Sequence, residues 1–304
     1  MEFGSGDFRY ELAEGWGQLP SGWQWGQIAA VAVDSQDRVY VYTRTNHPMM
    51  IFDRSGNFIR SWGETILPKD PHGLCLDAQN NMFLVDREGQ VVMKFTADGK
   101  KVFELGTRDK PSDTGYTQEN RTVLRAAGPF HHPTDIALSS TGDFYVSDGY
   151  RNARVHKFSP DGKLLFSWGE PGTGPGQFRL VHGIWEAKGR VYVADRQNNR
   201  IQIFTPEGRY LDKWDGFLQP MKIFVDAHDI MYVPELEGRI SILDLKGKVL
   251  ARWGSPDDRK AEPGKFVCPH GIWADKHGDF YVSEVQASGA PAIGQRIQKF
   301  VRKH

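Results

Sequence analysis

The chain has 304 residues, in which 38 Lys and Arg balance 38 Asp and Glu, so the formal net charge at pH 7 is zero. This balance leaves no basic field to attract nucleic acid or an anionic membrane, and we expect neither as a partner. Hydrophobic residues make up 39% of the chain and aromatic residues 12%, enough for a large core. The composition therefore excludes a disordered protein.

Neither cysteine content nor apolar runs indicate secretion or a membrane. Cys75 and Cys268 are too few for a disulfide framework. The longest clean apolar run, IAAVAV at 28–33, is too short to span a bilayer. The first residues contain no positive stretch followed by an apolar one, so we expect no signal peptide. We predict a cytoplasmic monomer.

In chain order, the first predicted element is a strand within residues 8–17, FRYELAEGWG, followed by a repeating unit. The first half of each unit begins with alternating apolar and polar residues, followed by a turn at Asp, Asn or Gly. A second stretch with an aromatic-Val pair follows the turn, as in DIALSSTGDFYVSD (135–148). The second half resembles ARVHKFSPDGKLLFSWG (153–169). Each half is a β-hairpin pattern, so one unit supplies four strands. The units begin near Ala30, Pro71, Pro133, Val181, Pro220 and Pro269.

Four antiparallel strands recurring every roughly 35–50 residues are typical of a propeller blade. The sixth unit ends at RIQKFVRKH (296–304) without its last strand, and residues 8–17 resemble the missing strand. We therefore predict an all-β fold, a six-bladed β-propeller forming one domain over 1–304. The N-terminal strand completes the last blade and leaves no open edge. No stretch has a 3.6-residue apolar period, which excludes a parallel α/β fold.

Histidine occupies one equivalent position in alternate repeats. The segments PHGLCLD (71–77), VHGIWEA (181–187) and PHGIWAD (269–275) place His72, His182 and His270 before a glycine and an apolar run. If this position begins the innermost strand, three imidazoles from alternate blades converge on the propeller axis. Three neutral imidazoles with an open fourth position form a typical catalytic Zn²⁺ site. The other repeats place Ala30, Thr134 and Met221 there.

A structural alternative exists for each of these histidines. A lone histidine in this context is explained by a blade corner, with its imidazole bonded to a neighbouring carbonyl. Three histidines at equivalent positions of alternate blades favour the metal site. The other histidines do not share the position: His47, His131 and His132, His156 in a predicted strand, and His228 and His277 in hairpin turns that we expect at the surface.

A second series of polar residues lies about 14 residues further on, at the end of the YVxD strand. It consists of Asp86, Asp148, Asp195, Glu235 and Glu284. In the first repeat Arg44 interrupts this acidic series, so we expect it to face something other than the neighbouring blade. Arg87 and Arg196 follow their acids by one residue, and Tyr150 follows Asp148 by two.

These arginines and this tyrosine allow two interpretations. Arginine binds a substrate carboxylate bidentately, and a tyrosine beside a cation can serve as general base. Alternatively, the segments are a repeat consensus in which Asp caps a turn and Arg pairs with it. We assign Arg154 and Arg200 to that structural role.

The segment 132–202, with its SDGY, HGIW and ADRQNNR motifs, resembles NHL-repeat propellers, specifically the peptidylglycine alpha-amidating lyase family. The resemblance covers essentially the whole chain. It implies a six-bladed propeller that holds zinc through three histidines, here His72, His182 and His270. The implied reaction cleaves a peptidyl-alpha-hydroxyglycine into a peptide amide and glyoxylate. The implied catalytic residues are Tyr150, Arg44 and Arg196.

The chain departs from the family at three places. The methionine next to the metal is replaced by Cys268, which we expect to be a small core residue. The acid that follows the third histidine, which serves a structural calcium site, is Gly271, so we expect no calcium. We expect neither the disulfides of secreted members nor a hydroxylating domain.

Two other functions remain open, a propeller hydrolase acting on a lactone or ester and a non-enzymatic NHL binding module. Such lactonases hold calcium through Glu, Asn and Asp, which a set of three histidines disfavours. A binding module for RNA is disfavoured by the balanced charge. The insertion 107–131 is predicted to cover one mouth of the propeller and to select substrate, with Tyr116 and Arg121 as candidate contacts.

Overall fold

The computed structural model describes residues 1–67, 70–286 and 295–303. The chain divides into two compact units, one formed by Met1–Pro71 with Met221–His304 and the other by His72–Pro220. In the described residues all regular structure is strand, apart from two three-residue 3-10 helices, η1 (Arg196–Asn198) and η2 (Pro256–Asp258). Among them we find no helix with the length and apolar character that crossing a membrane requires. The all-β prediction is confirmed.

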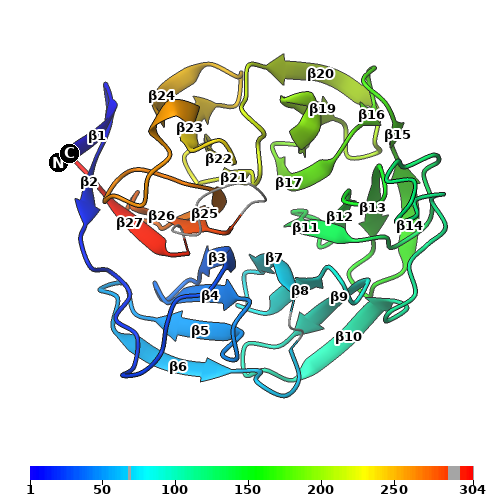
Figure 1. Cartoon of the computed structure of the whole chain (residues 1–304). Helices are drawn as coiled ribbons and strands as arrows, with labels where there is room; N and C mark the ends of the chain where they lie inside the picture. Colours follow the sequence, from blue (N-terminus) through cyan, green and yellow to red (C-terminus); the bar gives the residue numbers. More distant parts are fainter. Residues whose placement is uncertain (68–69, 287–294, 304) are drawn as a thin grey trace. The chain divides into compact units, whose positions relative to one another are not determined.

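The unit His72–Pro220 contains three antiparallel four-stranded sheets, blades 2, 3 and 4 (Figure 1). Blade 2 consists of β7 (Pro71–Leu76), β8 (Met82–Asp86), β9 (Val91–Phe95) and β10 (Lys101–Gly106). Blade 3 consists of β11 (Pro133–Leu138), β12 (Phe144–Asp148), β13 (Arg154–Phe158) and β14 (Leu164–Trp168). The short parallel pair β15 (Glu170–Pro171) and β16 (Gln177–Phe178) precedes blade 4. Blade 4 consists of β17 (Val181–Ala187), β18 (Arg190–Asp195), β19 (Arg200–Phe204) and β20 (Tyr210–Asp215).

The other unit also contains three sheets, blades 1, 5 and 6. Blade 1 consists of β3 (Ile28–Val33), β4 (Val39–Thr43), β5 (Met49–Phe52) and β6 (Phe58–Trp62). Blade 5 consists of β21 (Phe224–Val225), β22 (Ile230–Glu235), β23 (Arg239–Asp244) and β24 (Val249–Gly254). Blade 6 consists of β25 (Pro269–Ala274), β26 (Phe280–Glu284), β27 (Ile297–Arg302), β2 (Phe8–Ala13) and β1 (Glu2–Ser5). The fold is the predicted six-bladed β-propeller; the single-domain assignment over 1–304 stays a prediction.

The N-terminal strand completes blade 6, as predicted. Strand β2 pairs antiparallel with β27, in register from Tyr10 opposite Arg302 to Ala13 opposite Lys299 (Figure 1). Strand β1 then pairs with β2 and adds a fifth strand, which the sequence did not predict. The ring of Phe3 on β1 meets that of Phe300 edge-on at 5.5 Å. The outer edge of β2 is therefore covered by the chain's own first residues.

Acidic residues close the inner hairpins, which explains the repeated Asp in these turns. In blade 6 Asp275 Oδ1 accepts the backbone N–H groups of His277 at 2.9 Å and Asp279 at 3.1 Å. Asp226 makes the equivalent bonds to His228 and Ile230 in blade 5. The carboxylate thus replaces backbone partners that a tight turn lacks. His228 and His277 are exposed, as predicted.

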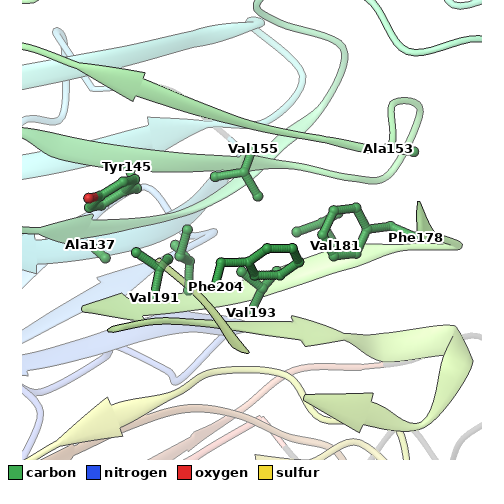
Figure 2. Close-up of a cluster of buried hydrophobic side chains, with 10 residues drawn as sticks. Ala137, Tyr145, Ala153, Val155, Phe178, Val181, Val191, Val193 and Phe204 are labelled. Atoms are coloured by element: carbon green, nitrogen blue, oxygen red, sulfur yellow. The ribbon is translucent and has the colours of Figure 1, made fainter. Parts of the chain in front are cut away.

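Figure 2 shows the apolar cluster between β11–β13 of blade 3 and β17–β19 of blade 4. Val191 and Val193 on β18 both contribute, because residues two apart on a strand share a face. Fully burying a valine or phenylalanine contributes roughly 1.5–3 kcal/mol. This packing fixes β17, which carries His182, and β12, which leads to the turn of Tyr150. The cluster consists of Ala137, Tyr145, Ala153, Val155, Phe178, Val181, Ile184, Val191, Val193 and Phe204.

The histidine position coincides with a β-bulge in the inner strand. Pairing shifts between Pro269 and Gly271, which leaves His270 opposite no residue of β26. The same shift leaves Thr134 unpaired in blade 3 and Ala29 unpaired in blade 1. A bulge re-aims the extra side chain. The equivalent residue of blade 1 is therefore Ala29, not Ala30 as the sequence alignment predicted, because the segment IAAVAV has no His-Gly pair to mark the position.

Candidate functional site

Two of the predicted metal ligands and the predicted tyrosine meet in the unit His72–Pro220. The imidazoles of His72, on β7, and His182, on β17, have ring centroids 4.9 Å apart and are 1% and 2% exposed. Tyr150 lies in the turn that follows β12. Its hydroxyl oxygen is 3.2 Å from Nε2 of His72 and 3.2 Å from Nε2 of His182. His72 and His182 lie 78 and 32 positions from Tyr150 in the sequence, and both imidazoles contact its hydroxyl oxygen.

A backbone carbonyl determines which nitrogen of His72 is protonated. Nδ1 of His72 lies 2.6 Å from the carbonyl oxygen of Thr134. A carbonyl only accepts, so Nδ1 carries the proton and Nε2 keeps its lone pair. This is the usual arrangement around a metal-binding histidine, whose second nitrogen donates to a carbonyl or carboxylate.

His270 has the same arrangement in the other unit. Its imidazole is 4% exposed, and its Nδ1 lies 2.6 Å from the carbonyl oxygen of Ala29. Thr134 and Ala29 both stand at the histidine position of their own blades. The two histidines therefore present Nε2 as the unprotonated nitrogen for the same structural reason.

The glycine after the histidine lets the two inner strands approach. A Cβ on Gly73 would lie 2.8 Å from the Thr134 carbonyl oxygen and 2.8 Å from Cα of Asp135. A Cβ on Gly271 would lie 3.0 Å from Cα of Ala30. The His-Gly pair in these segments thus combines a buried imidazole with the space that its supporting carbonyl needs.

The turn that carries Tyr150 is held from two sides. A Cβ on Gly149 would collide with the Val181 carbonyl, so only glycine fits against β17. The backbone N–H of Tyr150 donates to the carbonyl of His132 at 3.4 Å, and that of Arg151 donates to the carbonyl of His131 at 3.3 Å. The phenol is therefore positioned by backbone contacts to blade 4 and to the end of the 107–131 insertion.

Two guanidinium groups lie beside the phenol ring. Arg196 Nη1 is 3.5 Å from the Tyr150 hydroxyl, and its Nε donates to Gln219 Oε1 at 3.3 Å. The guanidinium carbons of Arg87 and Arg196 lie 5.0 and 5.8 Å from the Tyr150 ring centroid, within cation–π range. In the described residues no carboxylate lies within ion-pair distance of Arg196. The surroundings of the phenol are thus positively charged.

Arg44 is held by other groups in its own unit. Its Nη1 donates to Gln27 Oε1 at 2.7 Å, and its Nε lies 3.1 Å from Asp70 Oδ1 and 3.2 Å from the carbonyl oxygen of Pro71. The strand pairing also corrects its alignment, because Thr43 pairs with Ile28 as Asp148 pairs with Pro133. Arg44 is therefore equivalent to Arg87 and Arg196 rather than to the acids.

The acidic series has a structural role. Asp148 accepts the N–H of His131, Asp195 that of Arg179, and Glu284 that of Val267. Each donor lies three residues before the histidine position of its blade, so the acids hold the entry to the inner strand. The bonds satisfy N–H groups that would otherwise be orphaned on burial.

The predicted Asp–Arg pairing holds in blade 4 but not in blade 3. Arg200 Nε donates to Asp195 at 2.8 Å, as predicted. Arg154 instead donates to Gly169 and Glu170, which corrects its expected pairing. His156 takes the place beside Asp148, with its Nε2 3.3 Å from that carboxylate. Strand pairing decides which side chain faces the acid.

The part played by His131 and His132 was not evident from the sequence. Both are buried, at 6% and 4% exposure, and their carbonyls hold the turn of Tyr150. Burial, then the charges of Arg151, Arg87 and His131, lower the pKa of His132 to about 3. Glu88 lies 3.4 Å away, but its side chain is more than half exposed and does not offset these effects. The sequence signal for this role is the pair of histidines directly before Pro133, where β11 begins.

The remaining candidates lie in varied surroundings. Tyr116 in the 107–131 insertion lies 5.0 Å beneath the Arg151 guanidinium, whereas Arg121 is exposed. His47 stacks on Trp23 with ring centroids 3.3 Å apart. The buried Cys268 thiol accepts from Arg259 Nη2 at 2.9 Å, within an apolar group that includes Val267. Its predicted place in the core is confirmed.

The donor set fits a zinc ion. His72 and His182 direct two Nε2 atoms at one point in their unit, and His270 offers an unprotonated Nε2 in the other. Buried neutral imidazoles are the nitrogen ligands that Zn²⁺ prefers.

Comparison with known proteins places the chain in a family. The NHL repeat model matches residues 130–158. The mouse protein named NHL repeat-containing protein 3 is 30% identical over 92% of this chain and 80% of its own length. The chain belongs to the NHL-repeat family. This confirms the family resemblance.

The NHL-repeat relatives include enzymes named for amidation. Peptidyl-alpha-hydroxyglycine alpha-amidating lyase 2 of Drosophila melanogaster is 27% identical over 91% of this chain and 72% of its own length. Peptidyl-glycine alpha-amidating monooxygenase A of Xenopus laevis is 33% identical over 86% of this chain, which spans only 31% of that protein.

Solved structures share the fold. A streptogramin B lyase aligns over 97% of this chain and 98% of its own, with a TM-score of 0.65 and 16% identity. A gluconolactonase from Xanthomonas campestris aligns over 92% and 88%, with a TM-score of 0.62 and 13% identity. At these identities the likeness supports the propeller fold alone.

Proposed function

We propose that this NHL-repeat propeller is a zinc-dependent carbon–nitrogen lyase that cleaves a carbinolamide of the peptidyl-alpha-hydroxyglycine type into an amide and glyoxylate. The observation that carries the proposal is the Tyr150 hydroxyl, 3.2 Å from Nε2 of both His72 and His182 and 3.5 Å from Arg196. One oxygen thus lies beside two metal-type ligands and a cation. The relatives named as amidating lyases support the same chemistry.

We propose His72, His182 and His270 as the three metal ligands. All three are buried, and His72 and His270 share the Nδ1–carbonyl arrangement that leaves Nε2 as donor. Their equivalent positions in alternate blades support a common ligand set. A bound zinc ion supplies Lewis-acid polarisation of the substrate hydroxyl.

The chain's own residues perform the remaining steps. Tyr150, as phenolate, accepts the proton of the substrate hydroxyl. The oxygen's electron pair then forms the carbonyl of glyoxylate while the C–N bond breaks and its electrons pass to nitrogen. Tyr150 returns the proton to that nitrogen, which gives the amide. Arg196 binds the substrate carboxylate and stabilises the developing negative charge.

The role that the family resemblance implies for Arg44 stays a prediction. Its guanidinium already binds Asp70, Gln27 and the Pro71 carbonyl, and Pro71 directly precedes His72. The contact with the Pro71 carbonyl makes Arg44 a positioning residue for the strand that carries His72.

The test combines metal analysis with glyoxylate release. We expect about one zinc per chain in the wild type, loss of zinc in His182→Ala, and glyoxylate release from N-benzoyl-alpha-hydroxyglycine that a chelator abolishes and zinc restores. Tyr150→Phe should keep its zinc while kcat falls by roughly 10²–10⁴-fold, because only the general base is lost.

Tyr210→Phe, on β20, is the matched control and should behave as wild type. A zinc-loaded, folded wild type that releases no glyoxylate contradicts the lyase. A protein that stays metal-free after incubation with zinc contradicts the metal site and favours the binding-module alternative.

A further inference from the structure

We infer that a cavity between the inner hairpins of blades 5 and 6 binds a small carboxylate with an apolar body, and that Arg302 holds the carboxylate group. This inference lies beyond the proposed lyase function and depends neither on zinc nor on the histidine site. Three observations support it: the size and place of the cavity, the fixed position of the Arg302 guanidinium, and the contacts of the other ionisable groups around it.

The cavity lies within the unit that contains blades 1, 5 and 6. The turns between β21 and β22 and between β25 and β26 form its walls, at the end of β25 opposite His270. Its volume is about 400 Å³, which falls in the range of small-molecule sites. Its lining combines the apolar side chains of Phe8 and Ile230 with ionisable groups from both turns and from β27. A ligand that fits this lining has both an apolar and a charged part.

The Arg302 guanidinium is held in place at the wall of the cavity. Its carbon lies 4.3 Å from the ring centroid of Phe8, within cation–π range. Its Nη2 donates to the carbonyl oxygen of Asp7 at 2.6 Å, and its Nη1 donates to the hydroxyl oxygen of Tyr10 at 3.2 Å. Within the described part of the chain its Nε makes no hydrogen bond, so Nε and the adjacent Nη group can receive a carboxylate bidentately.

The charge of Arg302 is not balanced by an ion pair. Among the residues that the structure describes, no carboxylate oxygen lies within ion-pair distance of its guanidinium, whose partners are a carbonyl and a hydroxyl. Two other half-buried arginines of this unit do have acidic partners: Arg54 pairs with Asp275, and Arg296 pairs with Glu284. A ligand carboxylate would supply the acidic partner that Arg302 lacks, in a charge-assisted hydrogen bond.

The one acidic side chain among the lining residues, Asp226, is engaged by its own hairpin. Its Oδ1 accepts the backbone N–H groups of His228 at 2.8 Å and Ile230 at 2.9 Å, and its Oδ2 accepts the Tyr232 hydroxyl at 3.2 Å. Both carboxylate oxygens thus satisfy donors of the turn and the strand that follows it. The lining therefore offers no free carboxylate to a cation, and the ligand that it suits is an anion.

The remaining ionisable groups of the lining differ in their contacts. Lys276 Nζ and His277 Nε2 lie 3.0 and 3.2 Å from Asp37 Oδ2, so both already have an acidic partner. The imidazole of His228 is exposed and takes part in no hydrogen bond within the described ranges. An imidazole has an N–H donor in either tautomer, so His228 can donate to a second ligand oxygen. Arg302 and His228 thus form the polar part of the site, and the apolar part lies between them.

The test is titration of the full chain with benzoate, followed through the NMR signal of the His228 Cε1–H group. This signal, assigned with His228→Gln, reports on the cavity and not on the histidine site. We expect a saturable shift with benzoate and none with benzamide, which has the same ring but no charge. Arg302→Gln should weaken benzoate binding roughly 10–100-fold through loss of a charge-assisted hydrogen bond. Arg9→Gln, next to Phe8 on β2 and with a side chain 54% exposed, is the matched control.

A second variant separates ligand binding from folding, because Arg302 also binds the Asp7 carbonyl. Ile230→Trp fills the cavity from β22 and should abolish the benzoate shift with Arg302 in place. Benzoate binding of wild-type strength in both variants, or no saturable shift in the wild type, overturns the inference. A shift with inorganic phosphate but not with benzoate overturns the assignment to a carboxylate. Zinc-free protein should bind benzoate equally well, so failure of the lyase proposal leaves this result unchanged.

Discussion

The Nδ1 atom of His72 lies 2.6 Å from the carbonyl oxygen of Thr134, the residue at the histidine position of the next blade in the chain. The same bond, at 2.6 Å, joins His270 to Ala29. The inner strand of one blade thus determines which nitrogen of the adjacent strand's imidazole is protonated. It does so through a backbone carbonyl, which a side-chain substitution does not remove. The repetition of this bond makes the protonation of Nδ1 in both imidazoles a consequence of blade packing.

This relationship predicts the tautomers. In the metal-free protein we expect His72 and His270 to carry their proton on Nδ1, because a carbonyl acceptor faces that atom. Nitrogen-15 NMR of the imidazoles measures this directly, with His72→Gln used to assign the signals. The exposed His228 is the control and should show the Nε2–H form that free histidine prefers. An Nε2–H signal from His72 contradicts the prediction.

A second prediction concerns the close approach at Gly73. Gly73→Ala places a methyl group 2.8 Å from both the Thr134 carbonyl oxygen and Cα of Asp135, backbone atoms that cannot move aside independently. We expect the free energy of unfolding to fall by about 1–3 kcal/mol in urea denaturation, together with weaker zinc binding. Gly128→Ala meets no atom within 4 Å and should change neither quantity. Equal stability of the two variants contradicts the packing argument.

The 107–131 insertion is attached to the tyrosine turn through Thr114. Its buried Oγ1 donates to the Arg151 carbonyl at 2.7 Å and lies 3.0 Å from Nδ1 of His131. Thr114→Val leaves these groups without their partner, which costs about 1–3 kcal/mol. We expect steady-state kinetics to show a higher KM at unchanged zinc content.

Thr117→Val, in the exposed part of the same insertion, is the control for Thr114→Val and should leave KM unchanged. Deletion of the insertion should likewise change KM or substrate range while zinc content stays at the wild-type level. Loss of zinc on deletion contradicts a role confined to substrate selection.

The lowered pKa of His132 predicts that the free energy of unfolding falls at acidic pH. Its pKa of about 3 in the folded protein lies below the ordinary value of 6.5, so the unfolded chain takes up the proton first. The stability contributed by neutral His132 is fully present above pH 6.5 and is lost as the pH falls towards 3. Between pH 7 and pH 5 this loss amounts to about 2 kcal/mol.

The measurement is the free energy of unfolding at both pH values for the wild type, His132→Gln and the surface control His228→Gln. We expect the difference between the two pH values to shrink by about 2 kcal/mol in His132→Gln alone. Comparing the change in unfolding free energy between the two pH values within each variant removes the packing cost of the substitution itself. An unchanged pH dependence in His132→Gln contradicts the prediction.

Much of the fold could be predicted from the sequence because the relevant signals are local. Alternation, Asp and Gly turns and the recurring Trp-Gly strand end all act within one hairpin, and six copies reinforce one another. The incomplete last repeat predicted that residues 8–17 pair with it, and β2 does so. Strand β1 carries no such repeat signal, so its addition to blade 6 was not predictable.

The candidate site was predictable only in part. The equivalent positions of His72, His182 and His270 in alternate repeats identified them as candidate ligands from the sequence, without any interatomic distance. The alignment of Arg44 with the acids was wrong because blade 1 has Thr43 at the acid position, so no acid in its sequence marks the register that strand pairing shows. His131 and His132 were passed over because they act through backbone carbonyls, which residue type does not reveal.

The sequence by itself determined the blade, its number of copies and the residues that recur within it, since hairpin formation depends on neighbours a few positions apart. Only the tertiary structure decided which nitrogen of His72 faces Tyr150, which arginine is already bound to a carboxylate, and which carboxylates merely hold the backbone. Those properties depend on contacts between residues tens of positions apart, such as His72 with Thr134. They arise when the inner strands pack, because packing places one strand's backbone against the next strand's side chains.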